Sequence, residues 1–173
     1  MPGVSVEALG QRPEMRYVPP ATLSEWAETK SSFLSEAGAS EESARRVMQV
    51  RRQLIKALQV SRTGLLLGSD APQIYNVPGF SIHRELQSLV AAGLTPYQAL
   101  ETGTRNVATF FGSLATSGTI AVGKRADLVL LDGNPLTDVS NTTRRAGVML
   151  RGRWLPKAEI ETRLAAIARS VGN

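Results

Sequence analysis

A single carboxylate stands directly after the most apolar run of the sequence. The stretch GLLLGSDAP, residues 64–72, places three leucines between two glycines and ends on Asp70. An unbroken apolar run predicts a strand covered on both faces, as in a parallel sheet. Residues just past the carboxyl end of such a strand carry the chemistry of α/β units. Asp70 is therefore the candidate catalytic carboxylate, and the alternative is a cap or turn acceptor in Asp-Ala-Pro.

Other residues that could bind a metal or act as nucleophiles are scarce. The chain has no cysteine, which excludes disulfides, thiolate zinc sites and cysteine nucleophiles. It has one histidine, His83, whereas a metal centre normally draws on several His, Cys or carboxylate ligands. His83 falls in a predicted helix, away from the strand end, so we expect it to have a structural role.

Two groups of charged residues invite a functional interpretation. Lys124 and Asp127 lie in GKRADL, where the preceding glycine indicates a turn and Asp127 a strand entry, so we expect them to be architectural. A predicted helix over residues 40–60 carries several basic residues. We expect these side chains to lie in solvent, with their long aliphatic stems covering apolar surface. The alternative is that they form an anion-binding face. These basic residues are Arg45, Arg46, Arg52 and Lys56.

Apolar periodicity and turn residues predict a mixed α/β chain. Residues 1–22 are rich in proline and glycine and predict an irregular lead-in, and from Ser113 onward short glycine-punctuated strands replace the helices. Between them, Thr95 and Gln98 form a capping-box pattern. The predicted elements are helices over 25–37, 40–60, 80–92, 96–102 and 157–171, strands over 64–68 and 127–131, and a hairpin turning near 151–152.

Composition describes an ordinary globular protein of 173 residues, with 42% hydrophobic and 20% charged residues. The net charge of +5 could favour an acidic partner or nucleic acid. Aromatic residues, on which bases stack, make up only 5% of the chain, so we do not expect nucleic-acid binding. No run of 18 apolar residues and no signal-like start is present, so we expect neither membrane anchoring nor targeting, and we expect a cytoplasmic location.

Four motifs, in order and spacing, carry a family resemblance. They resemble the C-terminal part of the metal-dependent amidohydrolase superfamily, particularly its imidazolonepropionase-like and prolidase-like members. The resemblance covers about residues 41–155, and the third motif is the most specific. The motifs are LLLGSDAP, HRELQSLVAAGLTPYQALETGTRNVATFFG, SGTIAVGKRADLVLLDGNPL and VMLRGRW.

The resemblance implies an α/β fold built from the last β/α units of a (β/α)₈ TIM-like barrel. It places these units in residues 1–112, the C-terminal part of a small composite β-sandwich in 113–155, and a terminal helix in 156–173. It makes Gly64–Ser69 the eighth barrel strand. Asp70 then matches the aspartate that binds a divalent metal, with zinc expected, and takes a proton from the metal-activated water.

The implied reaction is hydrolysis of a carbon–nitrogen bond other than an ordinary peptide bond, in a small-molecule amide or cyclic amide. The family also carries an H-x-H pair, a lysine or carboxylate, and two later histidines on earlier strands, and these 173 residues contain no such segments. We therefore expect the chain alone to be inactive and not to hold a metal stably. Its expected partners are the remaining N-terminal barrel portion or a second copy of itself.

Two alternatives remain at this stage. The first is a non-catalytic interaction module that binds an acidic partner through the basic helix around residues 45–56. The second is a truncated reading frame with no independent role.

Overall fold

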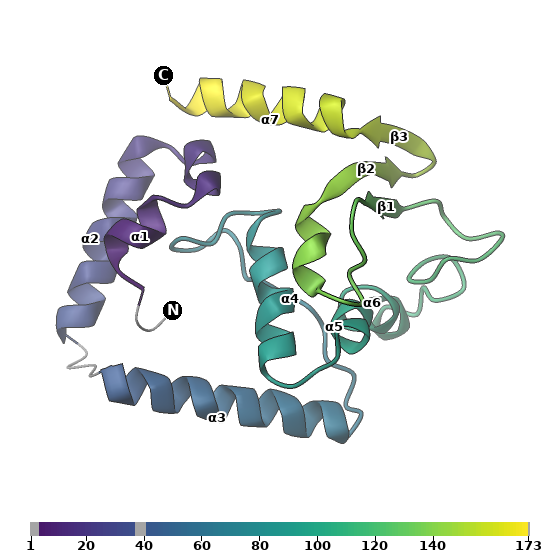
Figure 1. Ribbon diagram of the computed structural model, residues 1–173, viewed down its shortest axis with the longest axis horizontal. Helices are drawn as coiled ribbons and strands as arrows, with labels where there is room; N and C mark the ends of the chain where they lie inside the picture. Colours follow the sequence, from purple (N-terminus) through teal and green to yellow (C-terminus); the bar gives the residue numbers. More distant parts are fainter. Residues whose placement is uncertain (1–3, 37–40, 173) are drawn as a thin grey trace.

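The computed structural model describes residues 4–36 and 41–172 (Figure 1). Helices occupy the first two thirds of the chain, followed by a small sheet and a closing helix. In chain order the elements are α1 (Val6–Gly10), the 3₁₀ helix η1 (Pro13–Tyr17), α2 (Pro20–Glu36), α3 (Glu41–Val60), α4 (Ser81–Ala91), α5 (Pro96–Thr102), α6 (Arg105–Phe110), β1 (Leu128–Leu131), the 3₁₀ helix η2 (Val139–Thr143), β2 (Arg145–Leu150), β3 (Arg153–Pro156) and α7 (Lys157–Val171).

The N-terminal segment is more ordered than its prolines and glycines predict. An irregular lead-in over residues 1–22 is wrong for most of the described part, because α1, η1 and the start of α2 lie there. Ser5 caps α1 by accepting the backbone N–H of Ala8 at 3.1 Å. Pro13 and Pro20 begin helical segments, where a residue without an N–H loses no hydrogen bond. These prolines therefore start helices rather than break them. Residues 1–3 lie outside the described part.

The helices α4 and α5 follow the sequence prediction closely. At the end of α4, Gly93 takes a φ of +100°, and the next N–H, that of Leu94, donates to the carbonyl of Leu89 at 3.2 Å. The capping box of α5 is complete: the Thr95 hydroxyl accepts the Gln98 N–H at 3.2 Å, and the Gln98 side chain accepts the Thr95 N–H at 2.9 Å.

The main core lies where α4, α5 and η2 meet. Partly buried side chains from α3 and from the leucine run pack against it, which links these segments to α4. The buried members are Leu86, Leu89, Leu94, Ala99 and Val139, and the packed residues include Ile55, Leu65 and Leu67.

The strand predicted over residues 64–68 is wrong, since no strand forms there. The side chains alternate as in a strand, with Leu65 and Leu67 partly buried and Leu66 exposed. The backbone, however, makes only isolated bonds: Leu67 donates to the carbonyl of Thr102 at 3.0 Å, and the Asn106 side chain donates to the carbonyl of Leu65 at 3.0 Å. A strand needs a neighbouring strand to complete its ladder, and the described residues place none beside this run.

The predicted β module forms a three-stranded antiparallel sheet in the order β1-β2-β3. The β2–β3 hairpin turns at Arg151 and Gly152, whose φ values of +50° and +82° match the two positive positions of a type I′ turn. Gly147 on β2 faces the Trp154 ring on β3, where a Cβ would come within 2.3 Å of a ring carbon. The helix α7 follows β3 and contacts the sheet and η1. Figure 1 shows β1 at one edge of this sheet and β3 at the other.

Exposed apolar groups on unpaired segments predict self-association of the purified chain. Leu66 is 42% exposed, and Val129 and Leu130 on the edge strand β1 are each 57% exposed. Edge strands with apolar side chains pair readily with other chains. We expect sedimentation velocity to show larger species as concentration rises, and V129K/L130K to reduce them. The control I167K, on an exposed position of α7, leaves association unchanged. A concentration-independent monomer would contradict this expectation.

Candidate functional site

Asp70 lies at the start of the loop that joins the leucine run to α4. Its backbone φ is +53°, in the left-handed region that aspartate tolerates better than most residues. Its side chain is exposed, and its carboxylate accepts a hydrogen bond from the amide of Gln73. The N-cap position of α4 belongs to Phe80, so Asp70 does not cap that helix. The carboxylate therefore points into the loop rather than into a helix terminus.

The loop of residues 69–80 is held by its own polar groups. The Asn76 side chain donates to the carbonyl of Ser69 at 3.2 Å, and the backbones of Gln73 and Asn76 exchange hydrogen bonds at 2.8 and 3.3 Å. Tyr75 also has a positive φ, of +57°, although its side chain is buried. A buried tyrosine in this conformation persists only where its surroundings hold it in place.

The N-terminal helices supply those surroundings. Trp26 on α2 meets Tyr75 edge to face, with ring centroids 5.6 Å apart. Tyr17 stacks on Phe80, with centroids 5.1 Å apart. The same cluster buries Leu9, Met15 and Val77. Residues 4–26 thus form a cover over the Asp70 loop, an arrangement that helical periodicity alone does not predict.

A partly buried ion pair joins this cover to α4. Arg84 donates to the carboxylate of Glu14, whose side chain is only 8% exposed, and also to the Ser81 hydroxyl at 3.1 Å. Burial lowers the pKa of the neighbouring Arg12, and the positive charge of Arg84 lowers it further. Removing Arg84 would leave the buried Glu14 carboxylate without a compensating charge. In the sequence, the one signal of this pair is an acidic residue inside an otherwise proline-rich segment.

His83 has both ring nitrogens engaged in the scaffold, as expected of a structural residue. The Arg145 guanidinium can only donate, so at 2.9 Å it makes Nε2 the acceptor. The proton of the neutral ring then lies on Nδ1 and is donated to the Thr142 hydroxyl at 2.9 Å, which in turn donates to the carbonyl of Val139 at 2.8 Å. This chain of bonds ties α4 to η2 and β2.

Lys124 and Asp127 also have the architectural roles expected of them. The Lys124 ammonium donates to the Ser117 carbonyl at 3.4 Å and closes the loop before β1. Asp127 accepts the backbone N–H of Arg151 at 2.7 Å and a bond from Arg125, so it braces the β2–β3 turn. The hydrogen bond from Arg151 lowers the pKa of Asp127, and the bond and charge of Arg125 add to this effect.

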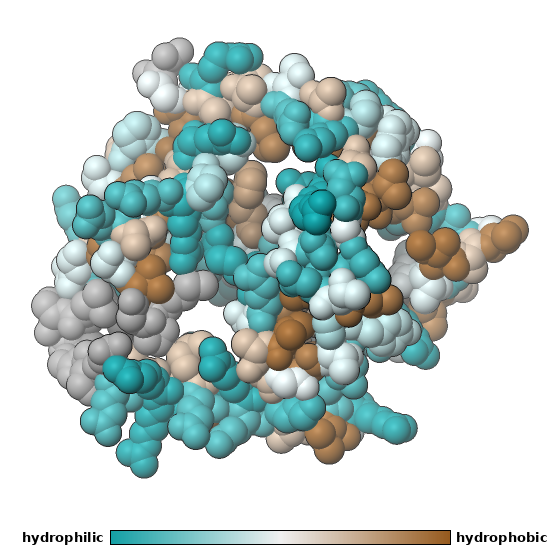
Figure 2. All heavy atoms as spheres, viewed as in Figure 1, coloured by the Kyte–Doolittle hydropathy of each residue, from teal (hydrophilic) through white to brown (hydrophobic). Residues whose placement is uncertain are grey.

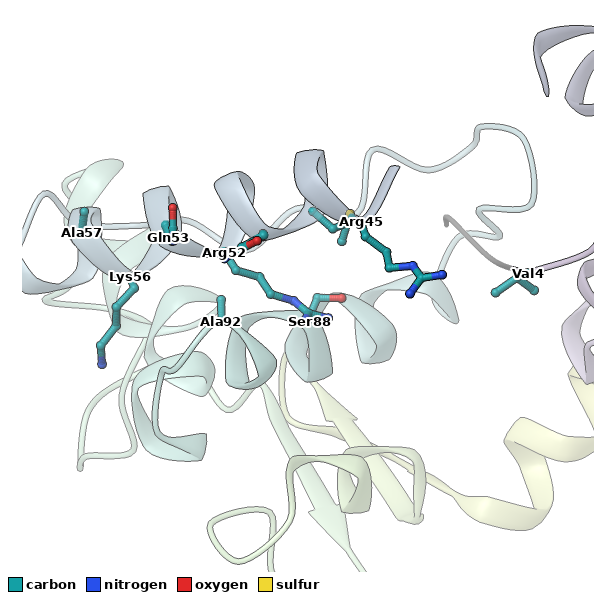
Figure 3. Close-up of a pocket in the computed structure, with 10 residues that line it drawn as sticks. Val4, Arg45, Arg52, Gln53, Lys56, Ala57, Ser88 and Ala92 are labelled. Atoms are coloured by element: carbon teal, nitrogen blue, oxygen red, sulfur yellow. The ribbon is translucent and has the colours of Figure 1, made fainter. Parts of the chain in front are cut away.

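Asp70 lines neither of two large clefts on the described surface. One, of about 730 Å³, lies among α4, α5, α6 and β1, with His83 and Arg145 in its wall. The other, of about 1000 Å³, lies between α3 and α4 (Figure 3). Within residues 4–36 and 41–172, no three His, Asp or Glu side chains come together in a way that could hold a metal ion. Asp70 could supply one ligand, so a metal does not fit this chain by itself.

Comparison with known proteins identifies the family. The model of the amidohydrolase family matches residues 14–155, which is most of the chain. The chain belongs to the amidohydrolase family. The resemblance carried by the four motifs is thereby confirmed, whereas the imidazolonepropionase-like branch stays a prediction. A search of curated proteins gave no match.

Solved structures of amidohydrolases share this fold. A proposed prolidase from Bifidobacterium longum is 31% identical, with a TM-score of 0.55 over 78% of this chain and 35% of that one. A molinate hydrolase is 23% identical, with a TM-score of 0.55 over 87% of this chain and 41% of that one. A Xaa-Pro dipeptidase is 20% identical, with a TM-score of 0.52 over 70% and 28%. The chain spans about a third of the length of these amidohydrolases. No described helix is long and apolar enough to cross a bilayer.

The partly buried position of His83 predicts a pH dependence of stability. Burial lowers the pKa of His83, and the charges of Arg145 and Arg84 lower it further. Below about pH 6.5 the unfolded chain binds a proton that the folded chain resists, so the free energy of unfolding falls as pH drops from 7 to 5. We expect urea midpoints to show this fall, and H83Q to show a shallower one. An equal fall of the urea midpoint with pH in the unmodified chain and in H83Q would contradict the assignment of this pH dependence to His83.

Proposed function

We propose that this chain is the C-terminal part of a metal-dependent amidohydrolase, with Asp70 as its contribution to the active centre. The parent enzyme hydrolyses a carbon–nitrogen bond in a small-molecule amide or cyclic amide. The observation that carries the proposal is the match of the family model to residues 14–155, with Asp70 directly after the leucine run. In finer terms, residues 1–112 belong to the last β/α units of the barrel, 113–155 to the β-sandwich and 156–173 to a terminal helix.

The leucine run supports the placement of Asp70 at a barrel strand end. Leu65 and Leu67 pack toward α4 and α5, as side chains between a strand and its outer helices do, and Leu66 on the opposite side is exposed. In a complete barrel that opposite side faces the interior, and neighbouring strands take the backbone groups of this run. Asp70 then emerges at the carboxyl end, where catalytic residues of barrel enzymes lie.

The loop geometry supports a functional role for Asp70. Asp70 has a left-handed backbone, and the buried, left-handed Tyr75 in the same loop packs against Trp26 of α2. Left-handed backbone conformations of non-glycine residues cluster at functional sites, where the surrounding structure fixes the orientation of a side chain. Asp70 is bonded to an exposed glutamine amide, which a ligand could displace.

The described residues do not form a metal site alone, so the remaining ligands belong to polypeptide beyond them. A divalent metal, expected to be zinc, would supply an activated water if the missing ligands were present. Asp70 is proposed as one of its ligands and as a proton acceptor.

The isolated chain is expected to show no metal-dependent turnover. Purified chain is mixed with zinc or manganese and assayed on cyclic amides, Xaa-Pro dipeptides and molinate, and we expect rates equal to those with metal alone. Isothermal titration should likewise detect no zinc site that D70N removes. Metal-dependent turnover abolished by D70N would contradict the inactivity and show that the described residues suffice.

Activity is expected only after complementation. The coding sequence immediately upstream should specify an H-x-H motif and two later histidines, and co-expression of its product with this chain should give a hydrolase. There, D70N should lower kcat by about 10²–10⁴-fold, the range for loss of a general acid–base group. The control D132N, an exposed aspartate after β1, should keep activity. A missing H-x-H motif, or equal activity of D70N and D132N, would overturn the proposal.

A further inference from the structure

Three cations of α3, Arg45, Arg52 and Lys56, are exposed to solvent, as expected, and they also line the cleft between α3 and α4. Arg45, Arg52 and Lys56 are seven and four residues apart, which places them on one face of α3. Figure 3 shows these side chains on the side of α3 that faces α4. Apolar residues that the helical pattern would turn inward, Val47 and Leu54, are instead 49% and 57% exposed.

The cleft exists because the two helices present side chains of unequal size. The side chains of Ser88 on α4 and of Ala92 at its C-cap are too small to fill the space between the helices. The lining side chains of α3 include long arginine and lysine side chains. Met48, Ala57 and Ala92 give the cleft an apolar component. Among the described residues, no carboxylate lines the cleft. The result is an open, partly apolar groove with positive charge along one wall.

The cations along the groove differ in their partners. Lys56 donates to the carbonyl of Gly93 at 2.6 Å, where the C-terminus of α4 favours a positive group. Within the described part of the chain, no carboxylate pairs with Arg52. Lys56 therefore holds the two helices together, and Arg52 remains available to a ligand. Figure 2 shows hydrophilic residues along the lower edge of the molecule, where α3 lies in Figure 1.

We propose that this groove, defined by Arg45, Met48, Arg52, Lys56, Ser88 and Ala92, binds an acidic peptide segment of a protein partner. The arginines at positions 45 and 52 are separated by about 10 Å along the helix axis, at 1.5 Å per residue. An extended peptide covers that length in about three residues, at 3.3 Å each. Two carboxylates three residues apart, with small apolar residues between them, match the arginines and the apolar part of the groove.

Two other ligand classes match the groove less well. The described residues that line the groove include no aromatic side chain, so they offer none of the stacking platforms of single-stranded nucleic-acid sites. A small anion such as phosphate would engage one cation only, because the two arginines lie far apart along the helix. The inference is independent of the proposed catalytic role, since it involves neither Asp70 nor its loop.

The test measures binding of a fluorescein-labelled peptide of sequence Glu-Ala-Ala-Glu-Ala-Ala-Glu to the full chain by anisotropy. We expect a dissociation constant below about 1 mM at low salt, weakening as ionic strength rises. R45E/R52E should weaken binding at least about tenfold, because two charge-assisted contacts become repulsive. R45Q/R52Q should also weaken it, and circular dichroism checks that each variant is folded.

The matched control is R46E/R51E, which changes the net charge equally but alters residues of α3 that do not line the groove. We expect this control to weaken binding by less than about threefold. Equal weakening of peptide binding by R45E/R52E and R46E/R51E would overturn the proposal that the groove is the binding site. Absence of binding by the unmodified chain would also overturn it. Tighter binding of an oligothymidine, or full competition by millimolar phosphate, would replace the peptide with another ligand class. D70N should bind the peptide normally, so failure of the catalytic proposal would leave this result unaffected.

Discussion

The packing of Leu65 and Leu67 against the core between α4 and α5 is the contact on which the candidate site depends. It anchors the segment before Asp70 although no strand ladder forms there, and Leu67 adds one backbone bond to Thr102. Fully burying a leucine side chain is worth about 1.5–3 kcal/mol and one hydrogen bond a net of about 0.5–1.5 kcal/mol, so these two partly buried leucines outweigh the single backbone bond. Side-chain burial therefore positions this segment. The opposite side chain, Leu66, stays exposed, and the backbone of the run makes only isolated hydrogen bonds.

The loop after Asp70 depends on residues far away in the chain. Rings from η1 and α2 pack on Phe80 and Tyr75, and the Glu14–Arg84 pair joins the same cover to α4. A partly buried pair of this kind contributes little net stability, but it specifies one arrangement, because the Glu14 carboxylate alone would be costly to bury. The N-terminal helices therefore act as a support for the loop. The family model begins at Glu14, so it includes η1 from that residue and α2 but not α1.

The two clefts show how helix orientation decides what a face can do. In α4, His83 turns toward η2 and β2, where arginine and threonine satisfy both ring nitrogens, so a titratable residue becomes part of the scaffold. In α3, small residues of the neighbouring helix leave room for arginine side chains between the two helices. Neither outcome follows from residue type, because each depends on the partner that the face meets.

The sequence by itself determined the elements with strong local signals. The capping box at Thr95, the glycine after α4, the turn at Arg151–Gly152 and the helical repeats of α3, α4 and α7 all follow from short-range chemistry. The four motifs also identified the family, which the family model confirms. Asp70 as a site residue stays a prediction from sequence and from the proposed role.

Only the tertiary structure decided the rest, because those features depend on partners distant in sequence. The apolar run at residues 64–68 forms no strand since no neighbouring strand is described beside it, whereas its composition predicts one. The prolines of the first 22 residues begin helices that cover the Asp70 loop, which a count of prolines does not reveal. The direction of the α3 arginines was likewise open, because helical periodicity defines a face but not the element that faces it.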